Sequence, residues 1–444
     1  MTEADLPRAV WNLAWPVVLE ATFFGLGGII NTILVGRLGA PALAAVGLGQ
    51  QVEFMIQVIF AAVTVGVTAI VSRHIGASEP HQANLAVDQS IIMAVLLGIL
   101  FTLPVWIFAE EAMVLLRAKP EVVKLGAQYI RIVAFSFIPG YVLAAGSSSI
   151  RGTGNTRTPM VVILSVTVCN IIFGYLLIYG GMGFPALGVR GAAIAGLISR
   201  VIGAIAILRI LIKGCGPLQY SFSRILRIDM GMTRRIVKIG LPAGLEQLQL
   251  QAAMTIYATI LSSLGTLVFA AHSITMRIEN LAFMPGFGFG MAAMALVGQS
   301  LGAKRADLGQ KASYISQKYA IISMTSVGTL LFFFGRHISF LFISNSDVIA
   351  LSSLSFKIWA FAMPMMATSN TLAGGLRGAG DTRWVLLIMA FCIWLLRLPL
   401  AFFLAISLGL GAVGAWAAAV FDINVRGAII WRRFASGLWK NIQI

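Results

Sequence analysis

Residues Trp15 to Gly39 read WPVVLEATFFGLGGIINTILVGRLG, an apolar run that carries one acidic residue, Glu20. A spanning helix needs about 20 apolar residues, so this run is long enough to cross a membrane. Its skeleton returns later in the chain at a constant numbering offset (246 − 20 = 226). The matching positions are Pro16 and Pro242, Glu20 and Glu246, and Leu38-Gly39 and Leu264-Gly265. Two halves that each place a glutamate at the same point of an apolar run form the strongest functional signal in the chain.

The composition is that of a polytopic membrane protein. Of the 444 residues, 59% are hydrophobic and only 11% are charged, whereas soluble domains carry about 25% charged residues. The net charge of +16 comes from basic residues in short loops between apolar runs. There they set the orientation and contact anionic lipid, so we expect a lipid bilayer and no nucleic acid as partner. Three scattered cysteines predict neither a disulfide framework nor a metal site.

The apolar runs predict an all-α protein of twelve transmembrane helices. Basic residues are concentrated in the loops on one side of these spans, and such loops stay in the cytoplasm. Both termini are therefore expected in the cytoplasm. The expected spans are about 10–36, 43–72, 84–109, 122–147, 157–180, 187–213, 236–263, 267–298, 312–335, 347–374, 384–407 and 410–431.

The repeat covers most of the chain. The segment RGTGNTR at 151–157 matches RGAGDTR at 377–383 with the same offset (377 − 151 = 226). Near the end the offset falls to 223, where Gly188 meets Gly411 (411 − 188 = 223). Each half holds an even number of spans, so the two copies share one orientation and are related by an axis along the membrane normal.

This repeat predicts two six-helix lobes related by a pseudo-twofold axis. The first lobe is residues 1–213, the second is residues 236–444, and a cytoplasmic linker at 214–235 joins them. In such a layout the substrate site lies near the midplane, and transport is a rocking of one bundle against the other.

Glu20 and Glu246 are the leading candidates for the transport site, because a charge at the centre of a spanning helix costs roughly 2.5–3.5 kcal/mol. Asn31 follows Glu20 by about three helical turns, and Tyr257 follows Glu246 at the same spacing. Each carboxylate therefore shares a helix face with a polar partner. Such a stripe can hold a proton or Na⁺ in one state and a cationic substrate in another. The alternative interpretation is a hydrogen bond that packs each helix against a neighbouring span.

Other charged or polar residues within the spans are secondary candidates. Glu279 lies beside Arg277, which it could neutralise, and Arg397 requires a counter-charge such as Asp422 or Glu246. Acids within the spans outnumber bases in this interpretation, which favours a cationic substrate. The secondary candidates are Glu53, Gln249, Arg277, Glu279, Arg397 and Asp422.

Two further patterns are interpreted without a catalytic role. The basic segments 151–157 and 377–383 lack the lysine of a phosphate-binding P-loop, so they are read as tight turns that anchor the cytoplasmic side. No nucleophile–base pair or HExxH pattern occurs in the sequence. We therefore expect neither an enzyme nor a cofactor, apart from a coupling ion.

As a set, these motifs resemble the multidrug and toxic compound extrusion (MATE) transporters. The resemblance rests on the RGxG(N/D)TR segments, the GA-containing turns after the second and eighth spans, NTILVGRLG in the first span and RLPLAF in the eleventh. It covers nearly the whole chain. It implies a V-shaped pair of lobes that exports amphipathic organic cations in exchange for H⁺ or Na⁺, acting as a monomer in the inner membrane of a prokaryote.

The family's ion-binding residues match this chain only in part. In the DinF-like branch, Asn31 occupies the position of an aspartate and Asn170 matches an asparagine, but Gly174 replaces a second aspartate. In the NorM-like branch, carboxylates on the seventh and tenth spans bind the ion. Glu246 lies on the seventh span about one turn early, and the tenth span has Met366 or Ala367 near the acidic position. The resemblance thus implies an ion or proton site near Glu20 and Asn31, or near Glu246.

The alternative function is a flippase of the same superfamily, acting on lipid-linked oligosaccharides or other anionic lipids. Such a protein would require an arginine-rich cavity, whereas a cation exporter would require a cavity with acidic and aromatic walls. The lining of the interior therefore discriminates between the two functions.

Overall fold

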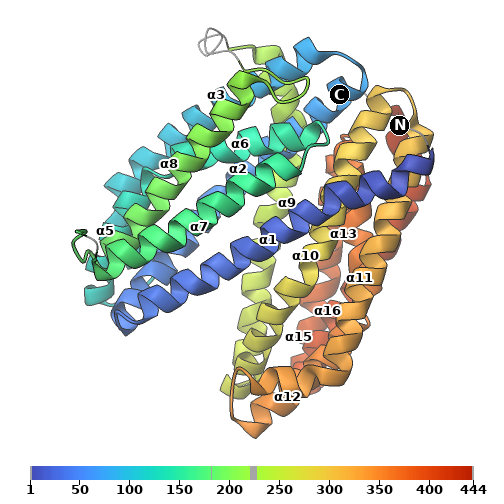
Figure 1. Cartoon of the computed structure of the whole chain (residues 1–444). Coiled ribbons are helices and arrows are strands. Elements are labelled where there is room, and N and C mark those ends of the chain that lie inside the picture. The colour runs from blue at the N-terminus through green and yellow to red at the C-terminus, as the bar shows by residue number, and fades with distance from the viewer. Residues whose placement is uncertain (1–2, 182, 221–227, 443–444) are drawn as a thin grey trace. The chain divides into compact units, whose positions relative to one another are not determined.

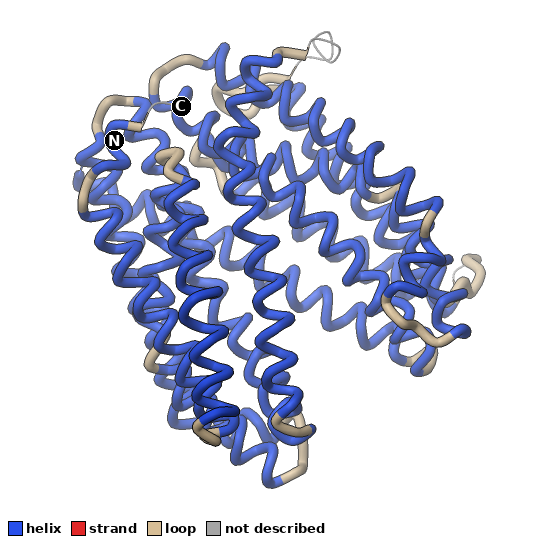
Figure 2. The backbone as a smooth tube through the Cα atoms, turned by 180° about the vertical axis from the view of Figure 1, so that it is seen from behind, coloured by secondary structure: helices blue, strands red, loops and turns tan. Residues whose placement is uncertain are grey.

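The computed structural model describes residues 3–181, 183–220 and 228–442, and long helices make up most of this part of the chain (Figures 1 and 2). The helices are η1 (Glu3–Asp5), α1 (Leu6–Gly36), α2 (Ala40–Gly76), α3 (Pro80–Ile107), α4 (Ala109–Leu115), α5 (Pro120–Ala134), α6 (Phe137–Gly152), α7 (Arg157–Tyr179), α8 (Val189–Lys213), α9 (Met230–Ser263), α10 (Thr266–Gly302), α11 (Ala306–Phe340), α12 (Ser346–Ala360), α13 (Met363–Gly378), α14 (Thr382–Ala390), η3 (Phe391–Arg397), α15 (Leu398–Phe402), η4 (Phe403–Ser407), α16 (Gly411–Ala435) and η5 (Leu438–Asn441). Of these, η3 and η4 are π-helical segments.

The chain packs as two compact units. Unit 1 comprises Met1–Val18 and Leu245–Ile444, and unit 2 comprises Leu19–Gly244. The divisions fall inside α1 and α9. Unit 1 therefore contains the start of α1, which belongs to the first half of the sequence, and unit 2 contains the start of α9, which belongs to the second half. The expected linker at 214–235 includes residues 221–227, which lie outside the described residues.

The helices confirm the predicted all-α membrane fold. Within the described residues, nine helices are long and apolar enough to cross a membrane, and two bent helix pairs can each supply one further span. The bends are 48° between α5 and α6 and 55° between α12 and α13. The remaining long helix is α9, with 34 residues. Its basic first turns and its glutamines make it less apolar than the helices counted above. It corresponds to the span predicted at about 236–263, the last of the twelve to be accounted for.

The duplication is visible in the backbone as well as in the sequence. Positive φ angles recur at repeat-related turns, where glycine avoids a steric penalty. Gly154 and Gly380 both have φ of 86°, and Gly188 and Gly411 have φ of 54° and 58°. The first pair obeys the larger offset (380 − 154 = 226) and the second the smaller one (411 − 188 = 223), so the loss of three residues lies before α16.

In unit 2, α2 packs against α3, α5 and α6, while α7 packs against α8 (Figure 1). A stack of aromatic rings fills part of its interior. Phe60 and Tyr141 are nearly parallel with ring centroids 4.2 Å apart, and Phe137 lies 6.0 Å from Tyr141 on the same stack. This stacking joins α2 to α6 beside the bend at the start of α6.

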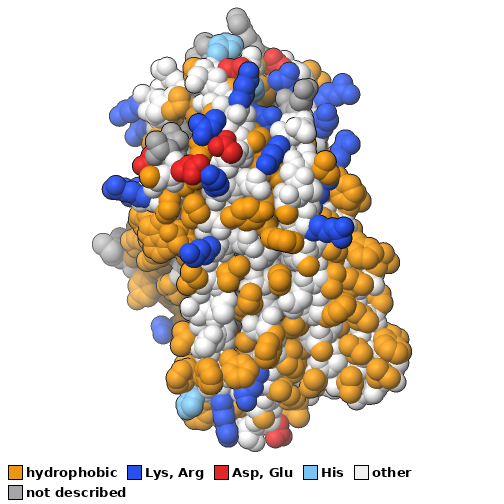
Figure 3. Space-filling model, turned by 90° about the vertical axis from the view of Figure 1, so that its right-hand side faces the viewer, with side chains coloured by type: hydrophobic (Ala, Val, Ile, Leu, Met, Phe, Trp, Pro, Cys, Tyr) orange, Lys and Arg blue, Asp and Glu red, His pale blue; other side chains and the backbone are white. Residues whose placement is uncertain are grey.

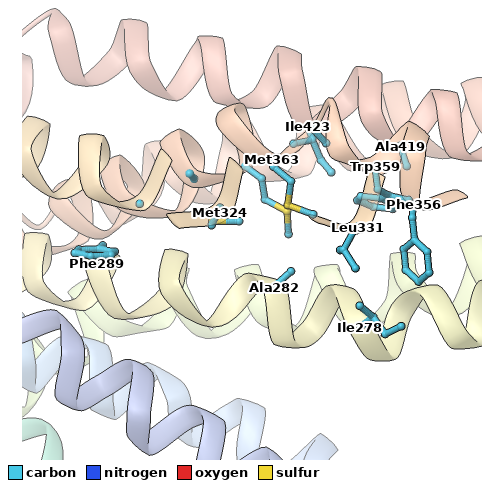
Figure 4. Packing of buried hydrophobic residues seen from close by; sticks show 14 of the residues in the cluster. Ile278, Ala282, Phe289, Met324, Leu331, Phe356, Trp359, Met363, Ala419 and Ile423 are labelled. Atoms are coloured by element: carbon cyan, nitrogen blue, oxygen red, sulfur yellow. The ribbon is translucent and has the colours of Figure 1, made fainter. Parts of the chain in front are cut away.

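In unit 1, an apolar core joins α10, α11, α12, α13 and α16 (Figure 4). Methionines fill the space that glycines leave open. A Cβ atom at Gly286 would lie 2.7 Å from the sulfur of Met324, and one at Gly328 would lie 2.8 Å from Cγ of Met363. Unbranched methionine adapts to such irregular gaps.

In unit 1, residues near both ends of the chain contact α11. Lys311 of α11 donates a hydrogen bond to Glu3 at 2.5 Å, and Lys440 of η5 donates to Gln310 at 2.7 Å. On the face shown in Figure 3, Lys and Arg side chains gather toward this end, and hydrophobic side chains cover much of the rest. We call it the basic end of unit 1.

The helix crossing between α10 and α13 depends on small residues. A Cβ atom at Gly374 would lie 2.2 Å from the carbonyl oxygen of Gly290, and one at Gly378 would lie 2.1 Å from that of Met294. Without side chains at these positions the two backbones touch, as is common where helices pack within membranes.

Gly374→Ala tests this crossing. The added methyl group has no room beside the α10 backbone, so we expect an overpacking penalty of about 1–3 kcal/mol and a lower melting temperature in detergent. Gly28→Ala is the matched control, because a Cβ atom at Gly28 of α1 meets nothing within 4 Å. Equal melting temperatures for the two variants would contradict the close approach.

Candidate functional site

Glu20 forms a half-buried ion pair within unit 2. It lies in the middle of α1, and Arg151 lies in the last turn of α6. The Arg151 guanidinium donates to the Glu20 carboxylate at 2.6 Å, and the side chains are 15% and 13% exposed, respectively. Gly152 lets this end of α6 approach α2, since a Cβ there would lie 3.0 Å from the side chain of Val71.

Glu246 forms the same ion pair within unit 1. Arg377, in the last turn of α13, donates to both carboxylate oxygens of Glu246, at 2.5 and 3.3 Å. Glu246 is 4% exposed and Arg377 is 20% exposed at the side chain. Because Arg377 is the repeat mate of Arg151 (377 − 151 = 226), the duplication preserves the acid and its cation together.

Arg151 and Arg377 have a second role that the turn motif alone does not predict. As turns, 151–157 and 377–383 would only anchor the protein at the membrane. The structure places Arg151 and Arg377 inside helices, aimed at the acids of α1 and α9. A sequence signal was available, since the arginines recur with the same offset as the glutamates.

The polar partners predicted for the two glutamates do not join them. Tyr257 donates to the carbonyl oxygen of Ala415 at 2.9 Å, and Gln249 donates to that of Leu386 at 3.2 Å. These bonds pack α9 against α16 and α14. Asn31 and Asn170 are half-buried, and neither side chain has a hydrogen-bond partner within the described residues.

A second ion pair in unit 2 joins Glu53 of α2 to Arg200 of α8. Arg200 also donates to the hydroxyl of Ser136 at 2.5 Å. The Glu53 side chain is 14% exposed. This arginine therefore neutralises Glu53 within unit 2 and connects α2, α8 and the start of α6.

Unit 1 contains a fully buried ion pair at the end of the first π-helical segment. Nε of Arg397 donates to Oδ2 of Asp422 in α16 at 2.9 Å, and Nη2 lies 2.8 Å from the same oxygen; the side chains are 2% and 0% exposed. Asp422 is thus the counter-charge of Arg397, and Glu246 is not. Arg397 also lies over the ring of Tyr257, with the guanidinium carbon 5.9 Å from the centroid. π-Helical turns are often found at functional positions.

Glu279 of α10 differs from these acids. It is 9% exposed, its Oε2 atom has no hydrogen-bond partner, and no cation forms an ion pair with it within the described residues. The suggestion that it neutralises Arg277 is wrong, because Arg277 is exposed and the two form no ion pair. Helical geometry explains this, since residues two positions apart point to different faces.

Arginines partner most of the interior acids. Among the described residues buried acids outnumber buried arginines and lysines, as predicted, but four of the interior acids have an arginine partner. These pairs are Glu20–Arg151, Glu53–Arg200, Glu246–Arg377 and Arg397–Asp422. Across the described residues, no group of three or more His, Cys, Asp or Glu side chains could hold a metal ion.

Comparison with known proteins agrees with the duplication. The family model MatE matches residues 16–176 and 242–403, two segments whose first residues obey the offset of the repeat (242 − 16 = 226). The probable multidrug resistance protein NorM of Thermotoga maritima is 29% identical, over 98% of this chain and 94% of that protein. The uncharacterized transporter YisQ of Bacillus subtilis is 26% identical, over 98% and 96%.

A solved structure shares the fold over nearly the full length. It is an outward-facing multidrug resistance MATE family transporter of the MOP superfamily, with a TM-score of 0.91 and 22% identity. The alignment covers 98% of this chain and 97% of that one.

The ion pair of Glu246 and Arg377 can be tested through stability. Removing one partner of a buried ion pair costs about 3–5 kcal/mol, and we expect the lower end for Glu246→Gln because Arg377 is partly exposed. The double variant Glu246→Gln/Arg377→Gln should be less destabilised than either single variant. Melting temperatures in detergent measure both effects.

Glu110→Gln is the control for this series. It breaks the Glu110–Arg131 pair, whose side chains are 57% and 41% exposed, and exposed pairs contribute about 0–1 kcal/mol. Strictly additive losses in the double variant would mean that Glu246 and Arg377 do not act as a pair.

Proposed function

The chain belongs to the MatE family of membrane transporters, and on that premise we propose that it exports amphipathic organic cations in exchange for H⁺ or Na⁺. The observation that carries the proposal is the repeated ion pair, in which each unit holds one interior glutamate against one arginine. The relatives described as probable multidrug resistance proteins support small-molecule export as the overall activity.

We place the basic end of unit 1 in the cytoplasm. Loops rich in Lys and Arg are retained there, and the described termini share that end. The substrate would therefore enter from the side of unit 1 that carries Arg377 and leave on the other side of a prokaryotic inner membrane.

The ion pairs offer a chemical basis for exchange. An arginine is a fixed cation that an organic cation can replace beside the same carboxylate. A proton or Na⁺ can also neutralise that carboxylate. Because these ligands compete for one acid, Glu20 or Glu246 holds only one of them at a time. Competition of this kind, combined with alternating exposure of the site to the two sides, produces exchange.

The cost of an unpaired charge favours states in which each interior carboxylate has a cation beside it. A carboxylate left without a cation in a low-dielectric interior loses several kcal/mol of solvation. Arg377, with two hydrogen bonds to Glu246, supplies the cation in the empty state. The substrate need only supply the positive charge that Arg377 supplies in the empty state. Recognition therefore requires positive charge and apolar surface, and not one particular shape.

A lipid flippase is the second candidate function. Unpaired interior arginines would favour it, because they bind the phosphates of lipid-linked sugars. Arg426 of α16 is an interior arginine of this kind, since it forms no ion pair within the described residues. The four interior arginines that are already paired favour the cation exporter.

The proposal predicts the behaviour of everted membrane vesicles. Under an imposed pH or Na⁺ gradient, wild-type protein should move a cationic dye across the vesicle membrane. Glu20→Gln or Glu246→Gln, or both, should abolish this transport while the protein remains folded. Glu110→Gln should transport normally, since it changes an exposed pair. Unimpaired transport in both interior variants would remove these glutamates from the mechanism, and no dye transport by wild type under either gradient would refute cation exchange.

A further inference from the structure

The two repeats treat one acidic position differently. Glu53 of unit 2 and Glu279 of unit 1 are repeat mates (279 − 53 = 226). Glu53 has Arg200 as its ion-pair partner, whereas Glu279 has none within the described residues. The two repeats therefore share the acid but not its ion-pair partner.

The position in unit 1 that is equivalent to Arg200 can be identified. Arg200 lies on α8, and its repeat mate on α16 is Ile423, at the smaller of the two offsets (423 − 200 = 223). Gly191 and Gly414 (414 − 191 = 223) occupy similar positions in this register, because each lies against the backbone of the preceding helical segment. A Cβ at Gly191 would lie 2.2 Å from the Leu177 carbonyl oxygen, and one at Gly414 would lie 2.8 Å from that of Leu404. Ile423 is buried in the apolar core of unit 1 (Figure 4).

The remaining charges near Glu279 are already engaged or too far away to pair. Arg397 and Arg426 are the charged groups that act on it electrostatically. Arg397 is held by Asp422, and Arg426 donates to the sulfur of Met389 at 3.3 Å. The neighbouring titratable groups are Tyr257 of α9 and His272 of α10 itself, whose rings are 5.7 Å apart.

The helices that pack against α10 supply no ion-pair partner for Glu279. Within the described residues, no charged group of α11, α12 or α13 forms an ion pair with it. An ionised carboxylate in this environment has no partner to offset its desolvation, whereas the neutral acid carries no such cost.

We propose that Glu279 carries the coupling proton in unit 1, while the Glu246–Arg377 pair receives the organic cation. This inference rests on the proposed cation exchange, selects H⁺ as the exchanged ion, and assigns the proton in unit 1 to Glu279 instead of the Glu246 carboxylate. The proton occupies a carboxylate oxygen of Glu279 in the empty protein. It leaves to water as the organic cation arrives, so one positive charge replaces another within the unit.

Arg426 connects the two acids. It interacts electrostatically with Glu246 as well as with Glu279. When an organic cation takes the Glu246 carboxylate, that carboxylate no longer offsets the charge of Arg426 or Arg377. The local potential becomes more positive, which favours the ionised form of Glu279 and releases its proton. The same linkage acts in reverse, so a proton that returns to Glu279 weakens binding of the cation.

The test measures protons released when the purified protein binds tetraphenylphosphonium in a weakly buffered, Na⁺-free potassium solution. Wild type should release up to one proton per bound cation. Glu279→Gln, which mimics the neutral acid, should bind the cation and lose most of this release, and it should be as stable as wild type. Glu110→Gln should release protons as wild type does.

Ile423→Arg provides a second, independent variant. It restores the cation that Arg200 supplies in the first repeat, so Glu279 should stay ionised and proton release should again be lost. Undiminished release from Glu279→Gln, or its marked thermal destabilisation, would overturn the inference. Absence of cation binding by wild type would instead refute the proposed exchange function. Cation binding that releases no proton from wild type would refute the role of Glu279 alone.

Discussion

The structure depends on one constraint, that a charge placed among membrane helices is costly unless an opposite charge lies beside it. The interior acids of this chain are not local features of single helices. Glu20 finds its arginine 131 residues away, and Glu246 finds its own at the same separation. Each pair fixes the last turn of a bent helix, α6 or α13, against the helix that begins its repeat. The bend and the ion pair thus form one arrangement that occurs in both repeats.

The two copies have since acquired different interiors. In unit 2, Phe60, Phe137 and Tyr141 form a rigid ring stack. Their repeat mates in unit 1 are Gly286, Met363 and Ala367 (286 − 60 = 226). Flat rings with few rotamers hold a fixed shape, whereas methionine beside glycine can repack around different apolar groups. Unit 1 also contains the buried pair of Arg397 and Asp422, whose positions in unit 2 are occupied by Ile171 and Ser199.

Much of this fold could be predicted from the sequence because its signals are local. Apolar runs of sufficient length give the spans, and a constant offset gives the duplication. The bends between α5 and α6 and between α12 and α13 are harder to predict, because each apolar run continues across them and only Pro139 and Pro364, in the first turns of α6 and α13, indicate a break. The arginine partners were missed for a related reason. A residue at the end of a span resembles a membrane anchor until the helix bends and turns it inward.

The division of α1 and α9 between the two units bears on biogenesis. The first turns of α1 leave the ribosome before any other helix, yet their partners are α10 and α11, as the contact of Trp11 with Phe289 and Tyr319 shows. Unit 2 likewise remains incomplete until the start of α9 has been synthesised. Domains usually fold in order as they emerge, but here the earliest segment must wait for the later half. During synthesis the amino-terminal turns of α1 are therefore exposed to lipid, the insertion machinery or a chaperone.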